Sequence, residues 1–429
     1  MRRQFSLAQI IAINTLPFAI ILFITSQGII SSLAFNDWLS IKLTALSLVC
    51  ILFYYIGFFL SFNLSKEREP RKSNICKFIF LFLIFLYITS YFLLYINAGG
   101  IPLIQHFLTN ENPSDLRANL YKNLEFPWII LAYVTSILGK GFIPLSLITL
   151  KTNYNKTIYL TISFLLVFIS ISAFEKIYLA WLFIPLSIYY IHTKELKKLF
   201  RTIIIFIILL TGISWISLNT ELASVQPIQK FTSANHPQSA SKINLLYTNQ
   251  TIGLEKVDLT TENDYQFLLN SSNRNSSFLY FINRLLWIPF ITAYDTLLYW
   301  DQNHNSFILF GVNRHLSNIF NIEFANLEKN VFMFQFKSGE ETTGNSNAFF
   351  IAESYVGFGL IGSIIFSLFI GLIFGFFIKT KVTAVVCAAP MIALGLISVS
   401  LISTFFSGGL GLFIISIFLF YKTNTTGAK

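Results

Sequence analysis

One apolar stretch of this sequence, residues 347–378, reads NAFFIAESYVGFGLIGSIIFSLFIGLIFGFFI and contains a single acidic or basic residue, Glu353. An α-helix needs roughly 20 predominantly apolar residues to cross the hydrocarbon core of a bilayer, and this stretch is longer. A helix satisfies its own backbone hydrogen bonds, as a segment surrounded by lipid must. The stretch therefore predicts a membrane-spanning helix.

Further apolar stretches give the whole chain the layout of a polytopic membrane protein. The chain is 54% hydrophobic and 12% charged, whereas soluble proteins average about 25% charged residues; its mean hydropathy is +0.65.

Thr157–His192 would be about 54 Å long as one helix, so we expect two short spans with Glu175 and Lys176 at the turn. The sequence predicts an all-α fold of about ten transmembrane helices, the others at 8–33, 40–63, 77–97, 127–149, 157–174, 177–192, 202–218, 382–405 and 407–421.

The lysines and arginines predict the orientation of these helices. They gather in the short loops and at both termini, and short loops rich in Lys and Arg stay on the cytoplasmic side. The net charge of +10 is thereby explained as a topology signal, without a nucleic-acid partner. We expect a multi-pass membrane protein with both termini in the cytoplasm. Residues 1–218 would hold seven spans and residues 347–429 three, with the polar stretch Asn219–Ser346 outside.

The exterior loop contains one segment, about 278–300, that is apolar enough to imitate a span. It carries Arg284, Pro289 and Asp295. On a helix, Arg284 and Asp295 would share one face with Tyr280, because they are about three turns apart. Proline would kink this helix. We therefore expect an amphipathic helix that lies in the membrane interface or re-enters the membrane from outside.

Several kinds of chemical site are missing from the sequence. It has no glycine-rich phosphate loop ending in Lys-Ser/Thr, no Cys/His cluster at zinc spacing, and no Asp-x-Asp motif. The three cysteines lie in or beside the expected spans, so a disulfide framework in the exterior loop is excluded. We expect neither a metal nor a cofactor, and a site built from scattered outward-facing residues.

Ionisable residues at membrane depth are costly and are functional candidates for that reason. Lys140, within Gly139-Lys140-Gly141, is the deepest: it either faces a cavity or extends toward the cytoplasmic surface. Glu353, expected about two turns into its span, needs a cation, a hydrogen-bond partner or a water-filled cleft; pairing with an arginine is the structural alternative.

Other candidates lie in the exterior loops. Arg117 either contacts a ligand or forms a salt bridge with Asp115 or Glu111. Lys176 and its neighbour Glu175 either lie below the surface or form a solvated turn. The same choice between function and solvated surface applies to the remaining candidates, Arg274, Arg284, Arg314 and His315.

One stretch resembles a known family. Asn345–Gly362 contains Glu353-x-Tyr355-x-x-Phe358-Gly359-x-x-Gly362. It resembles the stretch that opens a late span in the Wzy-type oligosaccharide repeat-unit (O-antigen) polymerases. Ala98–Leu103, followed by Arg117, resembles the third span of that family and the loop after it, and the layout of spans also matches. The Arg-x10-Gly pattern of some members is missing from the exterior loop, which instead contains two arginines, Arg274 and Arg284, ten positions apart.

The resemblance implies a metal-independent glycosyltransferase of lipopolysaccharide and polysaccharide biosynthesis. Such an enzyme lies in the bacterial inner membrane. On the outer face of that membrane it transfers a glycan from undecaprenyl diphosphate to the non-reducing end of another lipid-linked repeat unit. Its partners are the undecaprenyl-diphosphate-linked oligosaccharides and membrane lipid, with a chain-length regulator as a further candidate. Under this reading Arg117, Arg284, Arg314 and Lys176 are the candidate cations, His315 and Lys140 are further substrate contacts, and Glu353 is the candidate base or acceptor-positioning residue.

Three other functions fit the sequence. An O-antigen ligase shares the layout and the donor but uses a lipid A–core acceptor. A lipid-linked oligosaccharide flippase would need a charged cavity within the spans, which Lys140 would serve, although the long exterior loop speaks against it. A non-catalytic membrane scaffold is compatible with the aromatic and basic residues near the membrane surface.

The predicted topology has a direct test in reporter fusions. Positive loops stay inside, so fusions after Lys72, Lys151, Lys198 and Lys381 should report the cytoplasm. Fusions near Asn119 and within Asn219–Ser346 should report the exterior. An exterior signal at Lys198 would mean that Thr157–His192 crosses only once and that the assignment of the outward loops upstream must be redrawn.

Overall fold

The fold was analysed in a computed structural model, which describes residues 38–71, 73–122, 124–224, 288–303, 306–312, 314–336, 346 and 349–423. Six helical segments are long and apolar enough to cross a membrane: Trp38–Leu64, Asn74–Thr109, Trp128–Asn153, Leu196–Ile216, Phe350–Lys379 and Leu401–Phe420. Shorter apolar helices cover Lys156–Ser172 and Thr383–Ile397. The chain is thus an all-α multi-pass membrane protein. The count of ten spans stays a prediction, and its first span, 8–33, lies outside the described residues.

The described elements are nearly all helical. In the first half they are α3 (Trp38–Leu64), β1 (Arg68–Pro70), α4 (Asn74–Asn97), α5 (Pro102–Thr109), α6 (Pro113–Asn119), α7 (Trp128–Ile137), the π-helix η2 (Leu138–Phe142), α8 (Ile143–Asn153), α9 (Lys156–Ser172), α10 (Lys176–His192) and α11 (Leu196–Ser224). In the second half they are α15 (Ile288–Asn303), the 3-10 helix η4 (Leu309–Val312), α16 (Arg314–Phe320), α17 (Leu327–Phe336), α18 (Phe350–Lys379), α19 (Thr383–Ser398), α20 (Leu401–Phe406), α21 (Leu410–Phe420) and β2 (Tyr421–Thr423).

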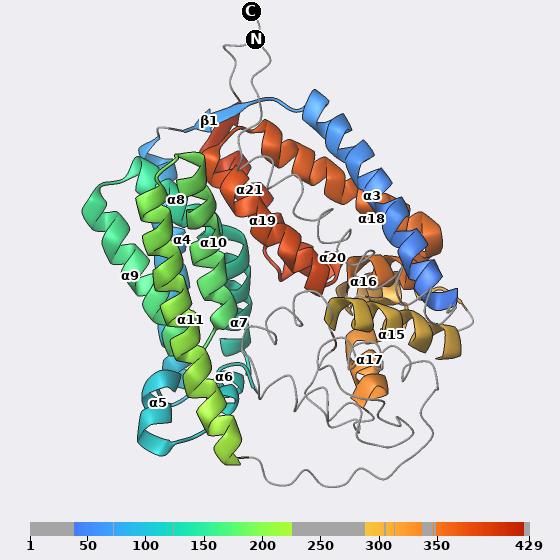
Figure 1. The fold of residues 1–429 in the computed structure, drawn as a ribbon, viewed down its shortest axis with the longest axis horizontal. Helices are drawn as coiled ribbons and strands as arrows, with labels where there is room; N and C mark the ends of the chain where they lie inside the picture. The colour runs from blue at the N-terminus through green and yellow to red at the C-terminus, as the bar shows by residue number, and fades with distance from the viewer. Residues whose placement is uncertain are drawn as a thin grey trace, which may run out of the picture.

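Figure 1 shows how these elements are arranged. Helices α4 and α7–α11 form one bundle, α3 and α18 run side by side across from it, and α19–α21 lie between the two groups. The short helices α15–α17 gather at the end of α3 and α18 where α18 begins. Helix α10 packs against α8, α11 and α19, which joins the bundle to the central helices.

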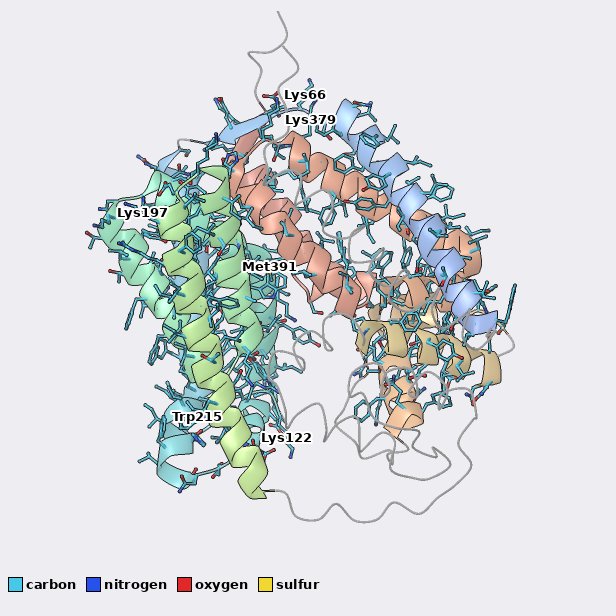
Figure 2. All side chains as sticks on the ribbon, viewed as in Figure 1. Lys66, Lys122, Lys197, Trp215, Lys379 and Met391 are labelled. Atoms are coloured by element: carbon cyan, nitrogen blue, oxygen red, sulfur yellow. The ribbon has the colours of Figure 1, made fainter. Side chains whose placement is uncertain are left out.

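The loops richest in lysine and arginine meet at one end of the molecule. Lys66 and Lys379 lie there, whereas Lys122 and Trp215 lie at the opposite end (Figure 2). At the basic end β1 pairs antiparallel with β2, and Lys422 forms a 3.0 Å ion pair with Glu69. Among the described residues, Lys66, Lys379 and Lys422, which are predicted to be cytoplasmic, are therefore gathered on one side of the fold.

Helices α3 and α18 approach so closely that their backbones touch. A Cβ on Gly57 would lie 2.2 Å from the Leu368 carbonyl oxygen, and one on Gly371 would lie 2.1 Å from that of Tyr54. Lipid tails are as apolar as leucine, so membrane helices associate through close packing, which small residues at the interface permit. These glycines explain why α3 and α18 are paired.

Three predicted spans are less regular than expected. The span predicted at 127–149 contains the π-helix η2, and the one predicted at 382–405 is interrupted at Val399, which is extended (φ −137°, ψ 150°). Helix α18 begins at Phe350 and is broken at Gly359 (φ 66°, ψ −157°), a conformation that glycine tolerates because it lacks a Cβ. Glu353 therefore lies in the first turn of its helix, not two turns inside it.

The sequence between Thr157 and His192 forms two helices, as predicted. Helices α9 and α10 are separated by the turn Ala173–Glu175, in which Phe174 has a positive φ of 55°. In the segment 278–300, which the sequence predicts to be exterior, the described part begins at Ile288, the first residue of α15. Arg284 and the rest of the segment before Ile288 lie outside the described residues.

The α3–α18 contact predicts the effect of adding one methyl group. Gly371→Ala should destabilise the protein by about 1–3 kcal/mol, because the new Cβ would force the two backbones apart. The measurement is the melting temperature in detergent. Gly212→Ala is the matched control, since a Cβ there would meet no atom within 4 Å. Equal melting temperatures for both variants would contradict the close contact.

Candidate functional site

Glu175 lies in the turn between α9 and α10, where three sequence candidates come together. The Tyr121 hydroxyl donates to Glu175 Oε1 at 3.4 Å. The cations of Arg117 and Lys140 both act electrostatically on the same carboxyl group. Arg117 is exposed on α6, and Lys140 is half-buried in η2. We call Arg117, Lys140 and Glu175 the Glu175 cluster.

Burial and charge compete at Glu175. Burial raises the pKa of the carboxyl group, while the charges of Arg117 and Lys140 and the hydrogen bond from Tyr121 lower it; the net shift is upward. Desolvation disfavours the charged carboxylate, whereas nearby cations favour it. A carboxyl group with a raised pKa exchanges a proton more readily near neutral pH. The position is therefore suited to acid–base chemistry beside an anion.

The backbone that carries Lys140 is a π-helix, and its two flanking glycines are required by close contacts. A Cβ on Gly139 would lie 2.4 Å from Cε1 of Tyr178, and one on Gly141 would lie 2.1 Å from the Gly409 carbonyl oxygen. Single π-helical turns inside α-helices are frequent at functional sites. The Gly139-Lys140-Gly141 sequence thus places one cation on a π-helix whose backbone packs tightly against its neighbours.

A group of five tyrosines surrounds Glu175. Tyr87, Tyr91 and Tyr95 lie four residues apart on α4, so they share one helix face. The Tyr91 and Tyr121 hydroxyls are 3.3 Å apart, and the Tyr95 hydroxyl is 2.8 Å from Ser172 Oγ. Tyr178 of α10 packs edge-on against Tyr91. The hydroxyl groups of these tyrosines form a polar patch within an otherwise apolar helix bundle.

Glu353 belongs to a separate group of polar residues. Its side chain is 3% exposed, and Oε2 accepts the backbone N–H of Leu401 at 3.1 Å. The Ser400 hydroxyl also bonds to this carboxyl group, and the charged group that acts on it is another acid, Glu328. Within the described residues Glu353 makes no ion pair, so the expected alternative of an arginine partner is not seen there.

Two more buried groups complete this second cluster. Gln335 Nε2 donates to Asp295 Oδ2 at 2.7 Å, and Ser346 Oγ donates to Gln335 Oε1 at 2.9 Å. The Ser346 N–H donates to the carbonyl oxygen of Glu328 at 3.0 Å, which links the pair to that residue. Burial raises the pKa of Asp295 to about 7. We call Asp295, Glu328, Gln335 and Glu353 the Glu353 cluster.

The remaining candidates are placed differently. Lys176 begins α10 beside Glu175, whereas Arg314 is exposed at the start of α16. His315 follows it, and its side chain lies outside the described part, as does Arg284. Arg117 forms no ion pair with Asp115 or Glu111 in the described structure. The structure thus brings Arg117 and Lys140 together and leaves Glu353 in another cluster.

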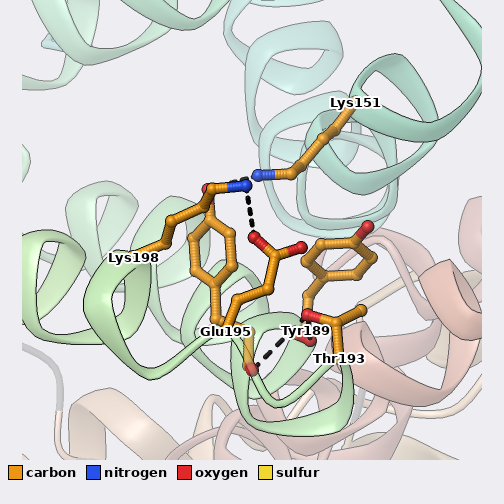
Figure 3. A network of polar contacts seen from close by, with 6 residues as sticks. Lys151, Tyr189, Thr193, Glu195 and Lys198 are labelled. Atoms are coloured by element: carbon orange, nitrogen blue, oxygen red, sulfur yellow. Dashed lines mark hydrogen bonds and ion pairs between the residues drawn. The ribbon is translucent and has the colours of Figure 1, made fainter.

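A third polar network includes Lys151, Glu195 and Lys198 (Figure 3). Lys198 forms an ion pair with Glu195, and Lys151 lies 3.9 Å from the centroid of the Tyr190 ring. The bond to Lys198 lowers the pKa of Glu195. This network faces the predicted cytoplasmic side and connects the ends of α8, α10 and α11.

Sequence reasoning missed the tyrosines and gave Glu175 no role in the chemistry. The spacing of Tyr87, Tyr91 and Tyr95 at every fourth residue was the available signal, because it places three hydroxyls on one helix face. The sequence around Glu175 contains no comparable spacing pattern. The importance of Glu175 depends on Arg117 and Lys140, which are distant in sequence. In the described residues no group of three His, Cys, Asp or Glu side chains could hold a metal ion.

The raised pKa of Asp295 predicts how stability depends on pH. The ordinary pKa of an aspartate side chain is 3.8, whereas Asp295 in the folded protein stays protonated up to a pH of about 7. The protonated side chain should stabilise the fold fully below about pH 4, and this contribution, up to about 4 kcal/mol, should be lost as the pH rises through about 7.

Asp295→Asn tests this because Asn keeps the acceptor for Gln335 but does not ionise. Relative to wild type, the variant should melt higher at pH 8 and at a similar temperature at pH 4. A melting difference that does not vary with pH would contradict the assignment.

No protein-family model, no characterised protein and no solved structure is significantly similar to this chain. Evidence on function therefore comes from the residues themselves and from their geometry.

Proposed function

We propose that this protein polymerises lipid-linked oligosaccharide repeat units. It would transfer a glycan from undecaprenyl diphosphate to the non-reducing end of another lipid-linked unit. The observation that carries the proposal is the Glu175 cluster, in which two cations flank a carboxyl group of raised pKa. Cations hold a diphosphate and neutralise its developing charge, and the carboxyl group accepts a proton.

In this mechanism the acceptor hydroxyl forms a bond to the anomeric carbon while the bond from that carbon to the phosphate oxygen breaks. Glu175 takes the hydroxyl proton, and the lipid diphosphate leaves. Arg117, exposed on α6, and Lys140, half-buried in η2, stabilise the departing anion. Glu175 is the better base than Glu353, whose carboxyl group is 3% exposed and already bonded to a backbone amide.

The surroundings suit substrates that are anchored in lipid. Helix α5 packs beside α6, which carries Arg117, and it exposes three large apolar side chains: Ile104, Phe107 and Leu108, at 50%, 67% and 78%. Apolar side chains next to a polar site favour a ligand with both a lipid chain and a charged head group. Helix α6, which carries Arg117, also lies at the end of the molecule away from the basic loops (Figures 1 and 2).

The same geometry would serve an O-antigen ligase, because the donor is the same and only the acceptor differs. Deleting the gene distinguishes the two. Surface glycan with single-repeat units would indicate a polymerase. Loss of surface glycan with polymer accumulating on its lipid carrier would indicate a ligase.

The cations are tested by substitution. Arg117→Ala should reduce polymer formation about 100- to 1000-fold, as expected when a contact to a developing anion is lost. Arg117→Lys should restore only part of the activity, since lysine lacks the planar fork of donors. The measurement is polymer length and amount per unit of folded protein. Lys122→Ala, at the same end of the molecule, is the control. Normal polymer from Arg117→Ala would count against the site.

The base is tested by Glu175→Gln, which keeps size and hydrogen bonding. Loss of a general base costs roughly 100- to 10,000-fold in rate. In the wild type the rate should rise with pH as Glu175 ionises, and the variant should lack this rise. A Gln variant with the wild-type rate and pH profile would remove Glu175 from the mechanism.

A further inference from the structure

Helix α20 connects the two polar clusters. Its first residue, Leu401, donates its N–H to Glu353 Oε2 at 3.1 Å. Ser400 is the N-cap, and its Oγ accepts the N–H of Ser403 at 3.0 Å. The Glu353 carboxyl group thus binds the beginning of α20 through the backbone.

The other end of α20 contacts the π-helix that carries Lys140. Ser136 Oγ donates to the Ser407 carbonyl oxygen at 3.1 Å. Gly409 has a φ of 80°, and a Cβ on it would lie 2.3 Å from the Gly141 amide nitrogen. The backbone after α20 is therefore packed directly against the residue that follows Lys140.

Between these ends the chain is a continuous hydrogen-bonded unit. The Thr404 N–H donates to Ser400 O at 2.8 Å, and the Gly408 N–H donates to Ser403 O at 2.7 Å. Six helical residues extend about 9 Å. A short, rigid element of this kind transmits a displacement from one end to the other.

We infer that Glu353 is a positioning residue: through α20 it holds the π-helical turn that places Lys140 beside Glu175. Its carboxyl group is buried, it accepts a backbone N–H, and it makes no described ion pair, which fits an acceptor better than a base. The effect on turnover rests on the proposed polymerase function, but the coupling between Glu353 and Lys140 does not.

The coupling is measured by the alkylation of a cysteine at position 140. Lys140→Cys is made with Cys76→Ser, because Cys50 and Cys387 are fully buried. A water-soluble maleimide then reports how readily the turn opens. Rates are compared on protein that elutes as a folded species in detergent.

Two substitutions each remove the hydrogen bond between Glu353 and Leu401, one by removing its acceptor and the other by removing its donor. Glu353→Met has similar size but no acceptor, whereas Glu353→Gln keeps one. Leu401→Pro removes the donor, and proline is tolerated at the first position of a helix. The extended Ser400 (φ −57°, ψ 150°) suits a following proline. Leu401→Ala keeps the N–H and is the control.

We expect Glu353→Met and Leu401→Pro each to speed alkylation about tenfold or more, as loss of this buried hydrogen bond should loosen the turn. Glu353→Gln and Leu401→Ala should change it by less than about threefold, because each keeps the bond. Unchanged alkylation in both Glu353→Met and Leu401→Pro would overturn the coupling. If one of the two does not fold, the other decides.

Activity gives the second measurement, with Lys140 retained. Glu353→Met should lose polymer formation, and a short thiol cross-link between Ser136→Cys and Ser407→Cys should restore part of it. A cross-link fixes α20 to α7 but supplies no base. A folded Glu353→Gln variant that makes no polymer while alkylation at position 140 is unchanged would assign Glu353 to the chemistry instead. A wild type without polymerase activity would overturn the proposed function and leave the alkylation result standing.

Discussion

The backbone contact between Gly141 and Gly409 is the constraint on which both polar clusters depend. A Cβ on either glycine would fall within 2.3 Å of the other residue. Lipid gives helices no hydrophobic reason to associate, so such contacts stabilise the fold through dispersion and hydrogen bonding. Here the contact joins the π-helix carrying Lys140 to the chain after α20, whose other end binds Glu353. A larger residue at either glycine would separate the clusters.

The two clusters handle buried charge in different ways. In the Glu175 cluster, the cations of Arg117 and Lys140 compensate a carboxyl group, which favours its ionised form. In the Glu353 cluster the described partners are hydroxyl, amide and carboxyl groups, and the pKa of Asp295 rises to about 7. Only the first arrangement offers positive charge to an anionic substrate. The second serves better to hold helices in place.

The distribution of charge along the fold connects the chemistry to the membrane. Lys66 and Lys379 lie at one end, and helix α6, which carries Arg117 of the Glu175 cluster, lies at the other (Figures 1 and 2). If the basic end is cytoplasmic, as loops rich in Lys and Arg predict, the cluster faces the exterior. Under the proposed function, the lipid-linked glycan donor would arrive there already activated, and Arg117 and Lys140 would assist the departure of its lipid diphosphate without a nucleotide cofactor.

The sequence by itself determined the class of fold, because long apolar stretches have few alternatives to membrane helices. It also predicted the two helices α9 and α10. It pointed to Lys140 and Glu353 because charges in apolar surroundings are costly, and to Arg117 as a cation of an expected exterior loop. It could not show which charges meet. Glu175 joins Arg117 and Lys140 only because α6, η2 and the α9–α10 turn are neighbours in space, and Glu353 binds α20 only because Val399 interrupts a stretch that reads as one helix. Contacts between distant segments depend on packing, which hydropathy along the chain does not record.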